Sequence, residues 1–123
     1  MLRTVDSLDE RDDRAKVAAI AEAVNLLWRK FLPEIRARVE ILESAALALA
    51  GGTLSPIQRE SAASAAHKLA GTLGTFSLAR GTLVARELEH LYTGGDGPSP
   101  ETAAQMAKEL RELVEGRSAS TAS

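Results

Sequence analysis

The side chains best suited to covalent chemistry near neutral pH are the two histidines, His67 and His90. The chain contains no cysteine, which excludes disulfides, thiolate metal sites and cysteine nucleophiles. A neutral imidazole is nucleophilic near pH 7, because the unperturbed pKa of histidine is about 6.5. The two histidines are far apart in the sequence, so their spacing does not match a zinc site, and we expect the chain to hold neither a metal nor a cofactor. The available chemistry is therefore that of a single imidazole.

Helical geometry places His67 on the surface of its predicted helix. At about 100° per residue, one side of this helix collects a core seam that consists of Ala62, Ala66, Leu69 and Leu73. His67 lies about 140° from Ala62 on the same helical wheel, on the far side from the seam. We therefore predict an exposed imidazole.

Four further residues share the exposed face with His67, namely Glu60, Ser64, Gly71 and Gly74. A glycine inside a helix costs about 0.5–1 kcal/mol relative to alanine. Two glycines beside an exposed imidazole therefore indicate that another molecule approaches closely. The alternative is that Gly71 marks helix packing and that Gly74 marks the end of the helix.

The N-terminal half of the chain carries two apolar stripes with helical spacing, separated by Pro33. The first stripe consists of Val17, Ile20, Val24, Leu27 and Phe31. Pro33 predicts a break or kink near Leu32. The second stripe ends at a glycine pair, Gly51 and Gly52, and consists of Ile35, Val39, Leu42, Ala46 and Leu49. Trp28 and Phe31 are accordingly predicted to be core residues, with a docking or dimer patch as the alternative.

The helix that carries His67 has a clear start. Ser55 and Gln58 have the spacing of a capping box, and Pro56 suits the first helical position. This spacing predicts a helix that runs to about Leu73 and ends around Gly74.

Two more helices follow. The first is predicted from Ser77 to about Tyr92, with His90 near its end, where an imidazolium would interact favourably with the helix dipole. A glycine-rich loop then leads to Ser99-Pro100, which repeats the cap-then-proline signal. The last helix is predicted to reach about Glu115, with an apolar side made of Met106, Leu110 and Leu113.

Composition and charge favour one all-α domain. Hydrophobic residues make up 45% and charged residues 26% of the 123 residues, and the net charge is −2, so there is no electrostatic argument for nucleic acid or an anionic membrane surface. No apolar run is long enough to span a bilayer, and we expect a cytoplasmic protein. We predict an antiparallel four-helix bundle with an additional N-terminal helix. The expected organisation is a charged lead-in over 1–14, the bundle over 15–115 and a disordered tail over 116–123.

Two segments resemble the histidine phosphotransfer (HPt) domain family of multistep phosphorelays in two-component signalling. Members of this family carry a histidine, an apolar residue two positions later and a glycine four positions later. These are matched by His67, Leu69 and Gly71 within AHKLAGTLGTFS over 66–77. A following helix of the family ends in a Leu-Glu pair, which is matched by Leu88 and Glu89.

The resemblance implies that His67 is the phosphoacceptor of a signal-transduction phosphoprotein, a carrier rather than a free-standing enzyme. It would accept the phosphoryl group from an aspartyl phosphate in a response-regulator receiver domain, and a sensor histidine kinase is a further expected partner. The receiver would supply the acidic pocket and the magnesium ion, because phosphoryl transfer depends mainly on positioning and charge stabilisation. The residues expected to support the phosphate or the partner are Glu60, Ser64, Lys68, Gly71 and Gly74. For Glu60 and Ser64 the alternative is an ordinary solvent-facing side chain.

Two positions depart from the family pattern. Many members have a lysine three residues after the histidine and a glycine ten residues after it; these positions are Ala70 and Ser77 here. Lys68 projects about 100° around the helix from His67, so it either reaches the phosphate through its long stem or is a solvated surface lysine. The departures leave open a pseudo-HPt adaptor that binds a receiver without accepting phosphate. A helical dimerisation module that uses the N-terminal helix is a third alternative.

Overall fold

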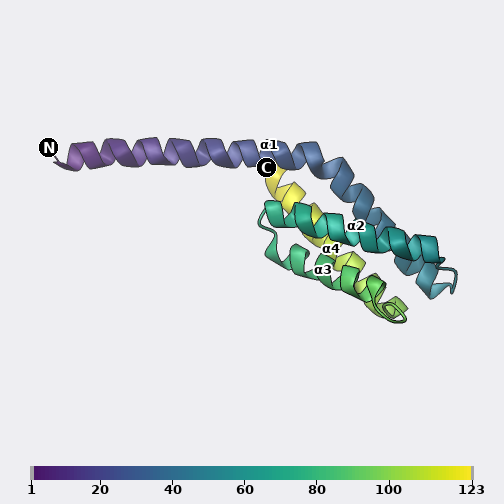
Figure 1. The fold of residues 1–123 in the computed structure, drawn as a ribbon. Helices are drawn as coiled ribbons and strands as arrows, with labels where there is room; N and C mark the ends of the chain where they lie inside the picture. Colours follow the sequence, from purple (N-terminus) through teal and green to yellow (C-terminus); the bar gives the residue numbers. More distant parts are fainter. Residues whose placement is uncertain (1, 123) are drawn as a thin grey trace.

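The protein is a helical bundle over the residues that the computed structural model describes, 2–122 for the backbone and 10–121 for the side chains. Figure 1 shows its helices, which are α1 (Leu2–Ala50), α2 (Pro56–Thr75), α3 (Ala79–Thr93) and α4 (Pro100–Ala122). Helices α1 and α3 each pack against both α2 and α4, which closes a ring of antiparallel helices. The predicted all-α bundle is confirmed.

Helix α1 passes through Pro33 without interruption, so of the break or kink predicted near Leu32 the structure has no break. A proline in a helix interior removes one hydrogen bond and clashes with the preceding turn, which kinks the helix. Figure 1 shows that α1 does bend in its middle part, in agreement with a kink. Trp28 and Ile35, before and after the proline, are both fully buried. Packing on each side of Pro33 therefore stabilises a helix that local propensity alone would end.

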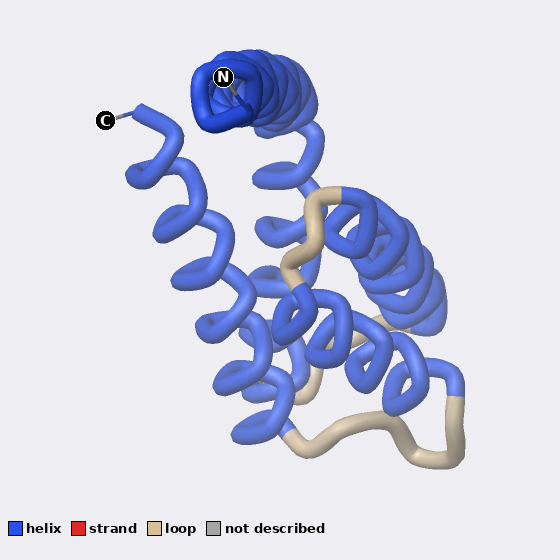
Figure 2. The backbone as a smooth tube through the Cα atoms, turned by 90° about the vertical axis from the view of Figure 1, so that its left-hand side faces the viewer, coloured by secondary structure: helices blue, strands red, loops and turns tan. Residues whose placement is uncertain are grey.

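The N-terminal half of α1 extends beyond the bundle, and Figure 2 views it nearly end-on above the other helices. The first apolar stripe lies mostly on this half, and its exposed members include Val17 at 66%, Ile20 at 64% and Leu27 at 47%. Most of this stripe is therefore exposed, although it falls within the bundle predicted over 15–115, because helical spacing identifies an apolar face but not what covers it. The additional N-terminal helix is thus an extension of α1. The lead-in predicted over 1–14 also falls within α1 from Leu2, although side chains 1–9 lie outside the described part.

The core is formed by the second stripe of α1 and the predicted seam of α2. The α1 residues Ile35, Val39, Leu42 and Ala46 are buried and Leu49 is half-buried; the α2 residues Ala62, Ala66, Leu69 and Leu73 are all buried.

Aromatic side chains close one end of this core. Trp28 is fully buried and its ring meets that of Phe76 edge-on, with 5.2 Å between the ring centroids. The predicted core position of Trp28 is confirmed. Phe31 also contacts Phe76 but remains 38% exposed, so it lies at the margin of the core.

The ends of α2 follow from local chemistry. Oγ of Ser55 accepts from the backbone N–H of Gln58 at 3.1 Å, and Oε1 of Gln58 accepts from the backbone N–H of Ser55 at 2.8 Å, which completes the predicted capping box. In the turn after α2, Ser77 has a φ of 59°, a left-handed conformation that a right-handed helix cannot contain. This explains why α3 begins at Ala79, two residues after the predicted start.

Helix α4 starts at the predicted cap but ends much later than predicted. Oγ of Ser99 accepts from the backbone N–H of Thr102 at 3.2 Å. The helix continues to Ala122, so the predicted disordered tail is wrong up to that residue, and Ser123 lies outside the described residues. Nε1 of Trp28 donates to Oγ of Ser118 at 3.1 Å, and Nη2 of Arg117 donates to Oδ1 of Asn25 at 2.9 Å. These contacts with α1 stabilise a segment whose small polar composition alone predicted disorder.

Candidate functional site

His67 lies in α2 with its imidazole directed away from the core. Its side chain is 72% exposed, whereas Ala66 and Leu69 beside it in the sequence are fully buried. The exposure predicted from the helical wheel is confirmed. The core seam determines which side of α2 faces the core, so it also determines that the imidazole, on the opposite side, faces solvent.

Among the described residues, the partner of the imidazole is Glu89 of α3. Nδ1 of His67 lies 2.8 Å from Oε1 of Glu89, a typical distance for a charge-assisted hydrogen bond. An ionised carboxylate can only accept, so Nδ1 carries the proton in this pair. In the neutral ring, the lone pair is then on Nε2, which is the nitrogen able to act as a nucleophile.

A hollow of about 510 Å³ lies beside His67 between α2 and α3. It is lined by Ala70 and Gly71 from α2 and by Arg86, Glu89, His90 and Thr93 from α3. A Cβ atom added at Gly71 would meet no atom within 4 Å, so packing within the chain does not require a glycine there. This argues against the alternative that Gly71 marks helix packing, and it leaves room for a second molecule next to the imidazole.

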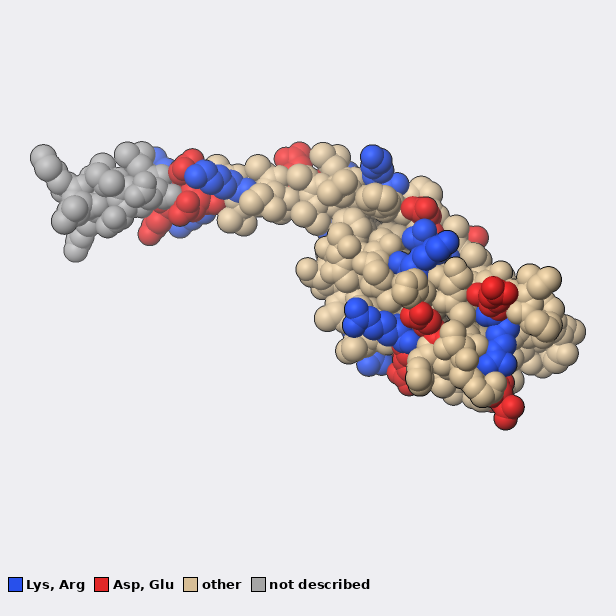
Figure 3. Space-filling view, in the orientation of Figure 1, with Lys and Arg blue, Asp and Glu red and all other residues tan. Residues whose placement is uncertain are grey.

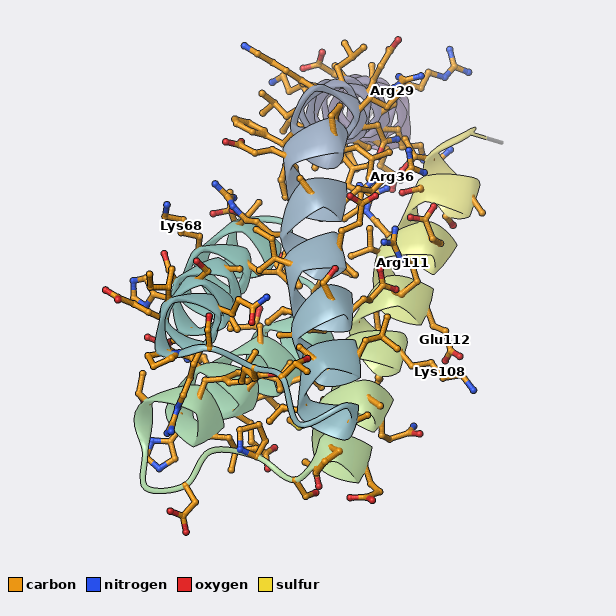
Figure 4. The ribbon with its side chains drawn as sticks, turned by 90° about the vertical axis from the view of Figure 1, so that its right-hand side faces the viewer. Arg29, Arg36, Lys68, Lys108, Arg111 and Glu112 are labelled. Carbon is orange, nitrogen blue, oxygen red and sulfur yellow. The ribbon has the colours of Figure 1, made fainter. Side chains whose placement is uncertain are left out.

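Two of the predicted supporting residues do not line the His67 hollow. Ser64 and Lys68 line a separate hollow between α1 and α2, together with Arg38 and Ile41 of α1. Figure 4 shows Lys68 on the outer side of α2, across α1 from Arg111 of α4. The structure therefore brings Gly71 to His67 in one hollow but does not bring Lys68 or Ser64 there.

Glu60 and Gly74 do not line the hollow either. Glu60 is exposed and forms no hydrogen bond or ion pair with the described residues. A Cβ atom at Gly74 would lie 3.6 Å from Oγ1 of Thr82, an ordinary contact with α3. Gly74 is thus the residue before the last residue of α2, Thr75, at the end of the helix where α2 contacts α3.

The α3 side of the hollow was not identified from the sequence. Arg86, Glu89 and His90 have the spacing that places residues on one face of a helix. This spacing can be recognised in the sequence, but it does not predict that this face of α3 packs beside α2. The family-like pattern likewise pairs Glu89 with Leu88 without indicating that its carboxylate reaches His67. His90 does lie in the last turn of α3, where it was predicted.

The described part of the chain offers little support for other kinds of site. Its side chains contain no group of three or more His, Cys, Asp or Glu that could hold a metal ion. None of its helices is long and apolar enough to cross a membrane. Figure 3 shows acidic and basic side chains interspersed over the bundle on the face that it displays.

Comparison with known proteins agrees with this geometry. The family model described as Hpt domain matches residues 26–119. Protein RcaC from Microchaete diplosiphon is 35% identical over 83 residues, which make up 68% of this chain but only 13% of RcaC. No solved structure gives a significant match. The chain belongs to the Hpt domain family, the histidine phosphotransfer modules of phosphorelays.

Proposed function

We propose that this chain is a phosphoryl carrier that accepts a phosphoryl group on Nε2 of His67 from the aspartyl phosphate of a receiver domain and passes it to another receiver. The observation that carries the proposal is the contact of 2.8 Å between Nδ1 of His67 and Glu89, since a carboxylate accepts a hydrogen bond there and so favours the tautomer with its lone pair on Nε2. A sensor histidine kinase upstream of the donor receiver completes the proposed relay.

The transfer step needs little from this chain besides a positioned nucleophile. The lone pair of Nε2 attacks phosphorus, so that a P–N bond forms while the P–O bond to the aspartyl carboxylate breaks and the carboxylate leaves. The proton stays on Nδ1, where the carboxylate of Glu89 balances the positive charge of the phosphorylated ring. The reverse step, on a second receiver, returns His67 to its neutral form. In this proposal the receiver supplies the magnesium ion.

The direct test uses the full chain and phosphorylated receiver domains from the same genome. We expect acid-labile label on the wild-type chain, loss of that label in His67→Gln, and its retention in the control His90→Gln. Glu89→Gln should lower the transfer rate less than Glu89→Ala, because a glutamine oxygen still accepts from Nδ1 but carries no charge to balance the phosphorylated ring. Glu89→Ala should lower the rate about tenfold, since the orienting hydrogen bond is lost.

The same assay separates the proposal from the adaptor alternative. Binding of a receiver without any label on His67 would select the pseudo-HPt adaptor. Label that persists in His67→Gln would show that another residue is the acceptor, and the proposal would then be wrong.

A further inference from the structure

Arg86 is a cation in the His67 hollow with no acceptor of its own. Its side chain is exposed and lines the hollow together with His67 and Glu89. Within the described part of the chain, the side chain of Arg86 forms no hydrogen bond or ion pair. Arg80, on the same helix, differs in this respect, because its guanidinium is held by the carboxylate of Glu109. A guanidinium without an acceptor beside a nucleophile is free to bind an incoming anion.

The charge balance of the hollow requires such a cation once His67 is phosphorylated. A phosphoryl group adds about −1.5 to −2 charges at neutral pH. The carboxylate of Glu89, 2.8 Å from Nδ1 of His67, balances the positive charge of the phosphorylated ring, so the charge of the phosphoryl oxygens needs a cation of its own. Among the residues that line the hollow, Arg86 is the only arginine or lysine, so it alone supplies a permanent positive charge.

The other nearby candidates do not face the hollow or lack a charge. Lys68 lines the separate hollow between α1 and α2. Ala70 lines the His67 hollow, but it has no charge and is only 4% exposed. A guanidinium presents paired donors that match two phosphoryl oxygens at once, which a lysine ammonium does not.

We propose that Arg86 binds the phosphoryl oxygens during transfer to His67 and stabilises their charge, in place of a cation on α2. This inference rests on the proposed function of His67. It assigns to α3 both the group that orients the imidazole, Glu89, and the group that neutralises the phosphoryl group, Arg86. The adaptor alternative rested on the departures at Ala70 and Ser77, and this role of Arg86 removes the first of these two reasons.

The experiment measures the initial rate of His67 labelling in the full chain with phosphoramidate, a small donor that needs no docking surface. We expect Arg86→Ala to lower this rate about tenfold and Arg86→Lys to lower it less. Adding Ala70→Lys to Arg86→Ala should restore most of the rate, because a lysine at that position can extend its ammonium into the same hollow. Arg29→Ala is the matched control: Arg29 is also exposed and its side chain has no acceptor among the described residues, but it lies on α1 outside the hollow.

Each outcome decides between the two proposals. If the wild-type chain is not labelled on His67 by any donor, both the proposed function and the role of Arg86 are wrong. If the wild type is labelled and Arg86→Ala is labelled within twofold of it, only the role of Arg86 is wrong. A defect of Arg86→Ala seen with a phosphorylated receiver but not with phosphoramidate would make Arg86 a docking residue and would also overturn the inference. Rescue by Ala70→Lys supports the charge role, since a merely structural defect of Arg86→Ala would not respond to it.

Discussion

The imidazole of His67 is held at one nitrogen and open at the other. Glu89 contacts Nδ1, and 72% of the His67 side chain is exposed. The exposed side was predictable, because it depends only on the periodicity of α2. The contact with Glu89 was not predictable, because it depends on how α3 is rotated against α2.

Gly71 provides a test of close approach at the residue scale. Since a Cβ atom there has nothing within 4 Å, we expect Gly71→Ala to raise the free energy of unfolding by about 0.5–1 kcal/mol through helix propensity. The same methyl group should slow transfer from a phosphorylated receiver while leaving labelling by phosphoramidate unchanged. Urea unfolding and the two labelling assays measure these effects. Gly116→Ala is the control, because Gly116 is also inside a helix with open space around its Cβ position; equal receiver transfer in both variants would contradict the prediction.

Ser77 occupies a backbone conformation that favours glycine. Its φ of 59° costs an L-residue about 1 kcal/mol relative to glycine. We therefore expect Ser77→Gly to raise the free energy of unfolding by up to about 1 kcal/mol, measured by urea denaturation. Ser77→Ala keeps the strain and should show no such gain. A loss of stability in Ser77→Gly would mean that the serine side chain contributes more than the strain costs.

At the scale of elements, α1 has two halves with different environments. The second half lies in the bundle, while the first exposes the apolar stripe that contains Ile20. Local sequence around Pro33 does not predict that α1 continues through this residue. Packing against the other helices, and not helix propensity, therefore decides which part of α1 is buried and which part is exposed.

The two halves of α1 should respond differently to truncation of an apolar side chain. Trp28→Ala is expected to lower the free energy of unfolding by about 3–5 kcal/mol, because it removes a fully buried ring. Ile20→Ala should change it by less than about 0.5 kcal/mol, because Ile20 is 64% exposed. Denaturant unfolding measures both. A large cost for Ile20→Ala, combined with a dimer in light scattering, would show that a second copy covers the stripe, as the dimerisation alternative holds.

At the scale of the whole molecule, ion pairs join helices that are distant in the sequence. Glu115 of α4 accepts from Nη2 of Arg36 at 2.6 Å and from Nε at 3.0 Å, and Arg111 contacts both Glu115 and Glu43. These labelled arginines lie between α1 and α4 in Figure 4. The hydrogen bond from Arg36, followed by the interaction with Arg111, lowers the pKa of Glu115. The hydrogen bond from Arg80 lowers the pKa of Glu109 in the same way and joins α3 to α4.

A lowered carboxyl pKa in the folded state makes stability depend on pH. The contribution of Glu115 should be complete above its unfolded pKa of about 4.3 and should be lost as the pH falls through the lowered folded value. Glu115→Gln should therefore reduce the free energy of unfolding at pH 7 by less than about 1 kcal/mol, because Glu115 is 40% exposed. In a urea series, the two curves should converge as the pH falls below the lowered folded pKa of Glu115. Glu112→Gln is the control, since Glu112 has no such partner among the described residues; a constant difference for Glu115→Gln at every pH would contradict the assignment.

The sequence by itself determined the features that depend on neighbours along the chain. The capping box at Ser55, the core seam of α2 and the exposure of His67 follow from spacing within a few turns of one helix. Tertiary structure decided which residues lie near the imidazole, because Glu89 contacts it and Arg86 lines the same hollow only through the packing of α3 on α2. It also decided that α1 continues through Pro33 and that α4 continues past Glu115, since buried contacts between α1 and α4 outweigh local preferences there. The periodicity of one helix does not encode interactions between residues distant in the sequence. The candidate site depends both on spacing within α2 and on contacts between α2 and α3.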